Sequence, residues 1–377
     1  MVASDETIAA EIISFLILIS IPFELFESTF IHIYHVVSTG FQLEHLLFVL
    51  YKNSQMLKFL TIGKKVFASN LIQAPLAGVS CAPFRELVWQ FGDVAYCCTE
   101  MLSALHIANG TDRSPRYQAR SPHENNLCWQ LSGNKPDILA RASEYAIQNR
   151  ADILDLNCGC PQPKIRKKGC GSQLLTDEKK LSQLIKAMKQ DDKTPVTVKM
   201  RIDAGKGEFC EISVAKMLEE AGADAIIVHG RHWTHDYDIP CQLDAIAKIV
   251  SSVSIPVIGN GDISDAKQLT NFFTTTHCAG FMIGRASVGQ PWIFQKIRCD
   301  IESKLFSTPS KNQTGQLFLK HIRGLIEFDG ERNAIFQSRK LGKYYARTID
   351  NKNEFLIKLY DTDSLSMLEK NVYEYFK

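Results

Sequence analysis

The 377-residue sequence lacks three features that define large protein classes. Its eleven cysteines are an odd number without a regular disulfide framework, which argues against a small secreted scaffold. Its net charge of +2 is too small for the whole molecule to act as a polycation, so any contact with nucleic acid needs a local basic patch. Its apolar runs are too short to cross a bilayer comfortably. We therefore expect a cytoplasmic protein with reduced thiols.

The first 56 residues differ in character from the rest. Residues 12–23 are apolar apart from two serines, but this run is short, and acidic Asp5, Glu6 and Glu11 precede it where a signal peptide would have a basic start. We expect residues 1–56 to be a poorly specified N-terminal extension or an over-called translation start. A peripheral membrane helix or a partner-binding helix is the less favoured alternative.

Short β-rich runs recur from residue 71 onward, each ending in glycine or a polar residue. They are continuously apolar, which is typical of parallel strands buried on both faces. Their starts are separated by about 24 to 43 residues, which leaves room for one strand, one helix and two loops. The runs are residues 71–78, 95–102, 127–133, 153–159, 196–201, 225–230, 256–262 and 280–285.

Helical periodicity fills the gaps between these runs, most clearly in residues 176–190 and 211–221. Eight such units predict an α/β fold, a TIM (β/α)8 barrel, in residues 57–307. An open doubly wound sheet is the alternative, but no GxGxxG motif follows the first run. The remaining residues, 308–377, have helical periodicity throughout, and we expect a small C-terminal all-helical domain there.

Polar residues end most of the apolar runs, where the active site of a TIM barrel lies. Packing alone does not require such a ring of polar side chains. Three cysteines near this ring, Cys158, Cys160 and Cys170, have a spacing that matches no common zinc or iron–sulfur site, and no fourth ligand is evident, so we predict no metal. The ring includes Glu100, Gln130, Asn157, Cys160, Lys199, Arg201, His229, Arg231, Asn260, Asp262 and Arg285.

The segment Leu154-Asp155-Leu156-Asn157-Cys158-Gly159-Cys160-Pro161 resembles the signature of the tRNA-dihydrouridine synthase family. Further blocks resemble the family in the family's order, and the tail around residues 339–345 is similar to that of the bacterial B-type branch. The resemblance covers roughly residues 57 to 377. One block is a weak signal, whereas eight in order are strong. The further blocks are residues 74–78 with 83–85, 99–101, 130–133, 198–201, 229–231, 259–262 and 282–286.

The resemblance implies an FMN enzyme that reduces the C5–C6 bond of a tRNA uridine, in the D-loop, using NADPH or NADH. Barrels commonly hold a cofactor phosphate with the loops after strands seven and eight, whose glycines let backbone N–H groups approach it. By resemblance, Gln130 and Lys199 contact the flavin edge, and His229 faces the phosphate or the substrate base. The predicted cofactor-binding residues are Pro75, Leu76, Ala77, Gln130, Lys199, His229, Asn260, Gly261, Asp262, Gly284 and Arg285.

Cys160 is the predicted catalytic residue. Reducing the uracil C5–C6 bond needs a hydride at one carbon and a proton at the other, and an ordinary thiol stays protonated at neutral pH and can act as a general acid. By resemblance, Cys160 protonates C5. Cys158, two residues earlier on the same strand, is expected to be packed. Asp155 is expected to brace the end of this strand without a catalytic role.

Two basic segments predict contacts with tRNA. Residues 163–168 follow the catalytic loop, and Lys340, Lys343 and Arg347 have the spacing of one helix face, with tyrosines among them. A solvated charged face is the alternative for both. Residues 232–234 depart from the family pattern, which leaves the contacts of that loop open. The predicted tRNA-binding residues are Asn157, Lys164, Arg166, Arg201, Arg231, Arg339, Lys340, Lys343 and Arg347, and no obligate protein partner is indicated.

Two other functions compete with this interpretation. One is an FMN barrel that acts on a free small molecule such as dihydroorotate, which explains the flavin loops but not the basic tail. The other is a barrel that binds and remodels tRNA without reducing it. That would need a broken catalytic cysteine or broken flavin loops, and both are intact in this sequence.

Removing residues 1–55 is expected to leave the barrel folded, because the family-like region starts at about residue 57. Solubility and circular dichroism of the truncated protein check this. An insoluble or inactive truncated protein, beside an active full-length chain, would make the extension part of the fold.

Overall fold

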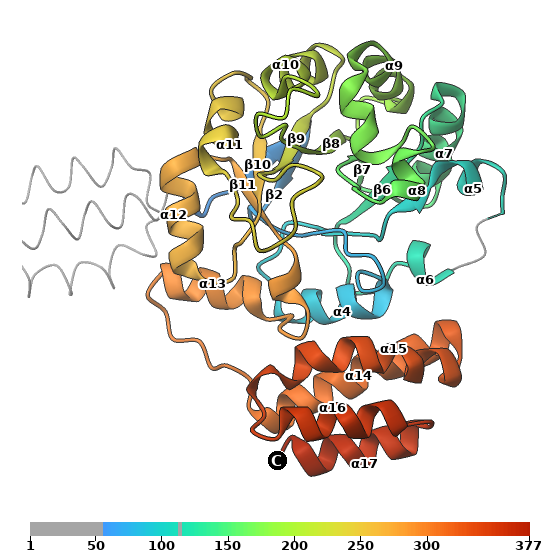
Figure 1. Ribbon diagram of the computed structural model, residues 1–377, viewed down its shortest axis with the longest axis vertical. Coiled ribbons are helices and arrows are strands. Elements are labelled where there is room, and N and C mark those ends of the chain that lie inside the picture. Colours follow the sequence, from blue (N-terminus) through green and yellow to red (C-terminus); the bar gives the residue numbers. More distant parts are fainter. Residues whose placement is uncertain (1–55, 112–114) are drawn as a thin grey trace, which may run out of the picture. The chain divides into compact units, whose positions relative to one another are not determined.

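The computed structural model describes residues 56–111 and 115–377 (Figure 1). The chain divides into two compact units, Met1–Leu57 and Lys58–Lys377, and the second holds the barrel and the C-terminal helices. Nearly all of the expected extension, with its membrane and partner alternatives, lies outside the described residues. Within them, no helix is long and apolar enough to cross a membrane.

A closed parallel β-barrel forms the centre of the second unit. Neighbouring strands follow one another in chain order, and the pairings of β11 with β3 and of β4 with β6 close the ring. This confirms the predicted TIM barrel. Its strands are β3 (Leu71–Gln73), β4 (Cys97–Cys98), β6 (Leu127–Ser132), β7 (Ile153–Cys158), β8 (Val196–Arg201), β9 (Ala225–His229), β10 (Val257–Asn260) and β11 (Gly280–Ile283).

The expected strand at residues 95–102 is broken. It forms β4 and a second short strand, β5 (Leu102–Ser103), both paired with β6, while residues 99–101 leave the sheet. The Thr99 hydroxyl accepts the Gln130 N–H at 3.1 Å and donates to the Glu100 carbonyl at 2.8 Å, which satisfies backbone groups that the break exposes. The break leaves Glu100 buried at the C-terminal end of the barrel.

An antiparallel hairpin, which the sequence pattern did not predict, precedes the barrel. Its strands are β1 (Leu60–Ile62) and β2 (Lys65–Phe67), too short for a visible alternation of apolar residues. Leu60, Ile62 and Phe67 share a buried cluster with residues of the barrel strands, among them Ile72 and Met282. The hairpin therefore completes the apolar core.

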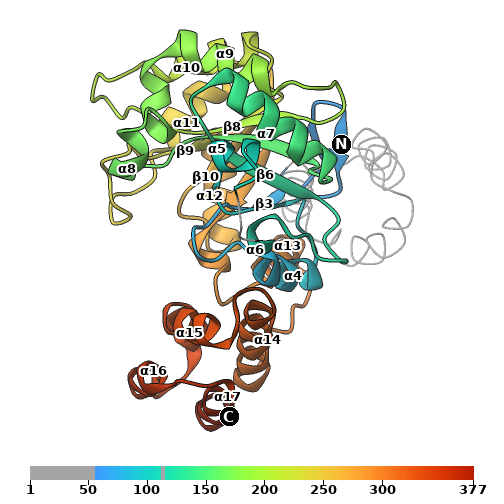
Figure 2. The same ribbon diagram turned by 90° about the vertical axis from the view of Figure 1, so that its right-hand side faces the viewer.

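Helices alternate with the strands around the barrel (Figures 1 and 2). The predicted helix at 176–190 starts later, at Glu178, because Asp177 caps it by accepting the Lys180 N–H at 3.0 Å. The predicted helix at 211–221 is α10. The helices are α4 (Ala82–Phe91), α5 (Ala104–Ala108), α6 (Pro115–Gln118), α7 (Pro136–Gln148), α8 (Pro163–Arg166), α9 (Glu178–Met188), α10 (Glu211–Glu220), α11 (Leu243–Val250), α12 (Ala266–Thr276) and α13 (Ile293–Ile301), with 3-10 turns η2 (Gly171–Thr176) and η3 (Arg285–Ser287).

The chain ends in helices only, which confirms the predicted C-terminal helical region. Ser310 starts the first helix with a reciprocal capping box to Gln313. Both views show this region beside α4 and α6, and the rings of Phe84 and His321 lie 5.7 Å apart across the contact (Figures 1 and 2). Its elements are α14 (Lys311–Asp329), α15 (Glu331–Tyr345), η4 (Ala346–Thr348), α16 (Lys352–Asp361) and α17 (Leu365–Tyr375).

Candidate functional site

Polar side chains of the neighbouring strands β6, β7 and β8 form one buried hydrogen-bond chain that runs toward the C-terminal end of β7. The carboxylate of Asp155 accepts the Thr197 hydroxyl at 2.7 Å and the Gln130 amide at 2.8 Å. The other end of Gln130, its Oε1, accepts the Asn157 amide at 2.8 Å. Burial raises the pKa of Asp155 to about 6, although both hydrogen bonds favour its charged form.

This chain of hydrogen bonds ends on the backbone of Cys160. The Oδ1 atom of Asn157 accepts the N–H groups of Cys160 at 2.9 Å and of Gly159 at 3.3 Å. On the other side, the Cys160 carbonyl accepts the N–H and the hydroxyl of Ser172, both at 3.1 Å. A Cβ atom on Gly171 would lie 2.7 Å from that carbonyl, so glycine is needed for this close approach.

The two cysteines of the β7 end differ in accessibility. Cys158 is fully buried, and burial raises the pKa of its thiol well above the usual range. Cys160 is partly exposed just beyond the strand. Of these two thiols, Cys160 is therefore the one that a ligand can reach at the barrel mouth, which is the C-terminal end of the barrel strands.

Arg201 secures the same loop from β8. It donates to the Gly159 carbonyl at 2.9 Å and to the His232 carbonyl at 2.8 Å, and it is buried. We expected Arg201 to contact tRNA. That contact stays a prediction, and within the chain Arg201 joins the loops after β7 and β9 through two backbone carbonyls.

Lys199 projects from β8 beside β10. Its ammonium donates to Asn260 Oδ1 at 2.9 Å, and the Asn260 amide donates to the Met282 carbonyl at 2.8 Å. Burial lowers the pKa of Lys199 to about 8, and the Arg201 charge acts in the same direction. An ammonium has three donors, so the bond to Asn260 leaves Lys199 able to bind an acceptor in the mouth.

His229, Arg231 and Asp262 form a second cluster at the ends of β9 and β10. Arg231 grips the Asp262 carboxylate with two bonds of 2.7 and 2.6 Å and also lies 3.2 Å from His229 Nε2. Because arginine can only donate, this nitrogen accepts. Burial and the surrounding cations lower the pKa of His229 well below its usual range. His229 is therefore a neutral imidazole.

The expected contact of Arg231 with tRNA stays a prediction. Arg231 is 1% exposed, and its remaining donors bond the carbonyls of Ile239 at 2.5 Å and Tyr237 at 3.2 Å. Each nitrogen of its guanidinium has a hydrogen-bond partner within the chain. The acidic Asp262 accounts for this, because a buried cation needs a counter-ion. In this arrangement Arg231 shapes the loop after β9.

Arg285 begins the turn after β11 and is half-exposed. Its guanidinium lies 3.8 Å from the centre of the Tyr237 ring and 3.5 Å from Asp262. Gly261, with a φ of +135°, sits against Cys241, and a Cβ atom there would lie 2.6 Å from its sulfur. The loops after β10 and β11 thus bring glycine backbone and one accessible arginine together.

The loop after β3 contributes apolar residues to the mouth. Pro75 and Leu76 are partly exposed and Ala77 is exposed, although they follow a fully buried strand. A Cβ atom on Gly284, after the neighbouring strand β11, would only make an ordinary contact of 3.6 Å with Leu76. Accessible apolar groups at the mouth suit the face of a flat ring, and the ammonium of Lys199 on β8 suits a polar edge. These residues therefore fit a flavin.

The two basic residues of α8 that were predicted to contact RNA differ in their partners within the chain. Lys164 is exposed. Arg166 lies 3.6 Å from the centre of the Trp233 ring and donates to the Ser172 hydroxyl at 2.8 Å. Arg166 is therefore held against the loop that carries Cys160.

The basic residues of the tail also have partners. Lys340 donates to the Ala77 carbonyl at 2.9 Å, and Arg339 donates to the Thr362 carbonyl at 3.4 Å. Helix α15 ends at Tyr345, so Arg347 lies on the following turn, where it donates to the Arg285 carbonyl at 3.2 Å. Lys343 is exposed, 5.0 Å from the Tyr344 ring.

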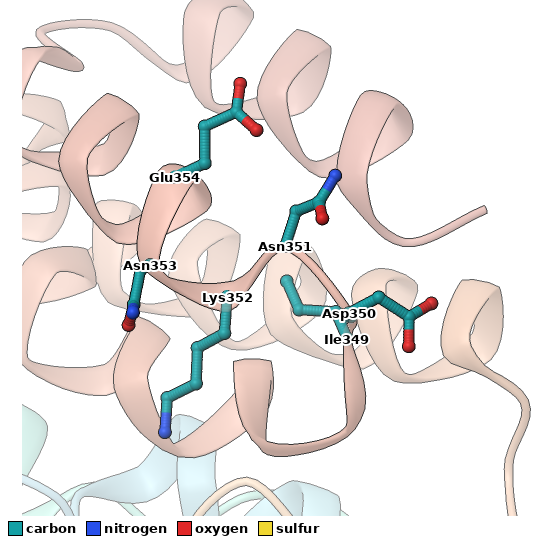
Figure 3. Close-up of a pocket in the computed structure, with 6 residues that line it drawn as sticks. All are labelled: Ile349, Asp350, Asn351, Lys352, Asn353 and Glu354. Carbon is teal, nitrogen blue, oxygen red and sulfur yellow. The ribbon is translucent and has the colours of Figure 1, made fainter.

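A hollow of about 510 Å³ lies elsewhere, at the start of α16 (Figure 3). One polar segment lines it, and none of the predicted site residues takes part: Ile349, Asp350, Asn351, Lys352, Asn353 and Glu354. Between residues 56 and 377, apart from the undescribed 112–114, no cluster of three His, Cys, Asp or Glu side chains could hold a metal ion.

Two residues of the mouth have contacts that the sequence pattern did not predict. Glu100, placed in the polar ring without a role, accepts the Gly78 N–H at 2.6 Å. Its position as the acid within an apolar run was a usable signal. Tyr237, which stacks on His229 with ring centres 6.4 Å apart, lies in an irregular loop where the sequence carries no such signal.

Comparison with known proteins gives consistent relationships. A family model described as dihydrouridine synthase matches residues 72–375. A tRNA-dihydrouridine synthase B of Vibrio parahaemolyticus is 32% identical, covering 78% of this chain and 91% of that protein. A tRNA-dihydrouridine synthase B of Pseudomonas putida is 33% identical over 78% and 87%, respectively. A probable tRNA-dihydrouridine synthase 1 of Synechocystis is 33% identical, covering 77% of this chain and 81% of that protein.

Solved structures share the fold at low identity. Histamine dehydrogenase from Rhizobium sp. 4-9 aligns with a TM-score of 0.53 and 14% identity, covering 72% of this chain and 51% of that chain. An amine oxidase acting on 6-hydroxypseudooxynicotine, from Pseudomonas geniculata, aligns with a TM-score of 0.52 and 13% identity over 67% and 50%. At these identities, the likenesses show the fold alone.

The raised pKa of Asp155 predicts a pH dependence of stability. Its carboxyl has a pKa of about 4 in the unfolded chain and about 6 in the folded protein, so the folded state binds the proton more tightly. The contribution of Asp155 to stability therefore falls as the pH rises from 4 to 6. Over these two pH units the free energy of unfolding loses about 3 kcal/mol of this contribution. Asp155→Asn removes the titration.

Urea unfolding of both proteins between pH 4 and pH 7 measures this effect. The free energy of unfolding of the wild type, minus that of Asp155→Asn, should fall as pH rises. A difference that stays constant or increases would contradict the assigned direction.

Proposed function

The chain belongs to the dihydrouridine synthase family, and from this premise we propose that it reduces the C5–C6 bond of a D-loop uridine in tRNA to 5,6-dihydrouridine. The enzyme class follows from the family: an oxidoreductase acting on a CH–CH group. FMN as the flavin and NADPH as the reductant are our proposal, as is a cytoplasmic location, where tRNA substrate is available.

The residues of the barrel mouth support a flavin mononucleotide. Pro75, Leu76 and Ala77 offer an apolar surface for a ring, and Lys199 would donate to its polar edge. The loops after β10 and β11 offer backbone N–H groups and Arg285 to a phosphate. Bound FMN would supply the hydride to C6 of the base.

Cys160 would supply the proton. The target base must leave its stack to enter the barrel mouth, where the Sγ proton of Cys160 would pass to C5. The observation that carries this assignment is the double anchoring of the Cys160 backbone, by Asn157 on its N–H and by Ser172 on its carbonyl, around a partly exposed thiol. A positioned acid needs such a rigid support.

For contacts with tRNA we propose exposed basic residues that do not bond a loop of the barrel, whereas Lys340 and Arg347, which are also exposed, do bond such loops. Lys164 and Lys343 are exposed and would meet the phosphate backbone, and Tyr344 beside Lys343 is partly exposed for stacking. An enzyme acting on a free small molecule such as dihydroorotate is not favoured, because relatives at 32–33% identity are named for tRNA.

Replacing Cys160 by alanine is expected to leave reduction of the flavin by NADPH near the wild-type rate, since no proton donor beside the RNA base is needed for it. The rate at which tRNA reoxidises the flavin should fall by about 10²–10⁴-fold, the usual effect of losing a general acid. Anaerobic stopped-flow absorbance separates the two half-reactions.

Cys158→Ala is the matched control, because Cys158 is buried two residues away on the same strand. Its tRNA-dependent rate should fall far less. If Cys158→Ala abolished reoxidation while Cys160→Ala retained it, the acid would be misassigned.

A further inference from the structure

One peptide group in the loop after β3 is held from both sides. The carbonyl of Ala77 accepts the Lys340 ammonium at 2.9 Å, and the N–H of Gly78 donates to the Glu100 carboxylate at 2.6 Å. These two backbone groups belong to the same planar peptide unit, so the two bonds fix its orientation. Lys340 belongs to α15, outside the barrel.

The loop around this peptide is a stiff turn. The N–H groups of Val79 and Ser80 donate to the Leu76 carbonyl at 3.0 and 2.9 Å, and the Ser80 hydroxyl accepts the Leu76 N–H at 2.8 Å. A rotation of the 77–78 peptide is therefore transmitted to Leu76. Gly78 has a φ of +71°, and a Cβ atom there would lie 2.6 Å from Lys340 Nζ, so glycine leaves the ammonium its place.

Glu100, which bonds the N–H side of this peptide, is also connected to the helical region through Arg116. Glu100 is buried, and Arg116 lies 3.9 Å from its carboxylate. Arg116 pairs in turn with Asp329 and donates to Gln337 at 2.9 Å, at the end of α14 and within α15. Both supports of the 77–78 peptide thus depend on how α14 and α15 dock.

The neighbouring loop has a similar support. Arg347 donates to the carbonyls of Arg285 at 3.2 Å and Ala286 at 3.5 Å, in the turn after β11. Strand β11 pairs directly with β3, so Lys340 and Arg347 hold adjacent loops of the mouth. Lys340 and Arg347 thus bond loops of the barrel, whereas the exposed Lys343 between them contacts the Tyr344 ring of its own helix.

We infer that Lys340 is a positioning residue of the flavin site, which sets the 76–80 turn against the flavin ring, and not a phosphate contact. The inference rests on the proposed function for the identity of the bound ring. It makes the helical region a structural part of the cofactor site as well as a surface for RNA. The properties of the flavin should then respond to a change made in α15.

The test compares Lys340→Met with Lys320→Met in the full-length protein. Methionine keeps the apolar stem and removes the ammonium. Lys320 is also exposed and also donates from the helical region to the barrel, to Gln90 Oε1 at 3.1 Å, but on α4 and not on the turn. Hydrogen–deuterium exchange of the 74–80 segment, the visible absorption of the bound flavin and the salt dependence of tRNA binding are measured for each protein.

Lys340→Met should raise amide exchange in residues 74–80 about tenfold or more and shift the flavin absorption, while the salt slope of tRNA binding stays at the wild-type value. Lys320→Met should change none of these. Lys340→Arg, which retains a donor, should restore slow exchange. Lys343→Met provides the comparison for the binding assay, because the loss of one phosphate contact lowers the slope by about 0.7–0.9.

Unchanged exchange in residues 74–80, together with a slope lowered as in Lys343→Met, would make Lys340 a phosphate contact and overturn the inference. The exchange measurement needs no flavin, so it decides the role of Lys340 at the turn in any case. A purified protein that binds no FMN would count against the proposed function alone.

Discussion

The buried carboxylate of Asp155 is the constraint on which the arrangement of the barrel mouth depends. A charge inside the barrel is tolerated only with donors on its oxygens, and Thr197 and Gln130 supply them. Satisfying Asp155 with the Gln130 amide nitrogen turns the Gln130 oxygen toward Asn157, and this in turn presents the Asn157 oxygen to the Cys160 N–H. The position of the partly exposed Cys160 thus depends on a buried carboxylate to which it is linked through Gln130 and Asn157.

The cations of the mouth divide into two groups. Arg201, Arg231 and Lys340 bond carbonyls or carboxylates of this chain, which fixes the loops after β7, β9 and β3. Within the described residues, Lys199 and Arg285 bond only the side chains of Asn260 and Asp262 and border the mouth, so they suit a ligand. A basic residue near the barrel mouth can therefore support a loop, and a hydrogen bond to a backbone carbonyl of that loop indicates this role.

Sequence periodicity predicted the barrel because each buried strand is a continuous apolar run, and the parallel topology then predicted the polar ring. The roles of the individual residues in this polar ring were harder to predict from the sequence. The pairing of Arg231 with Asp262, 31 residues away in sequence, is one contact that the sequence pattern did not predict. The short hairpin that carries Phe67 depends on its packing against the barrel, and no local pattern encodes it, whereas the acid Glu100 within an apolar run was a local signal.

The most direct test of the account is single turnover with a defined acceptor. Protein reduced anaerobically by NADPH is mixed with unmodified tRNA, with free uridine and with orotate, and flavin absorbance is followed while dihydrouridine is quantified by mass spectrometry. The account predicts that only tRNA reoxidises the flavin rapidly, with one dihydrouridine formed per flavin. Rapid reoxidation by orotate, with no dihydrouridine formed in tRNA, would contradict it.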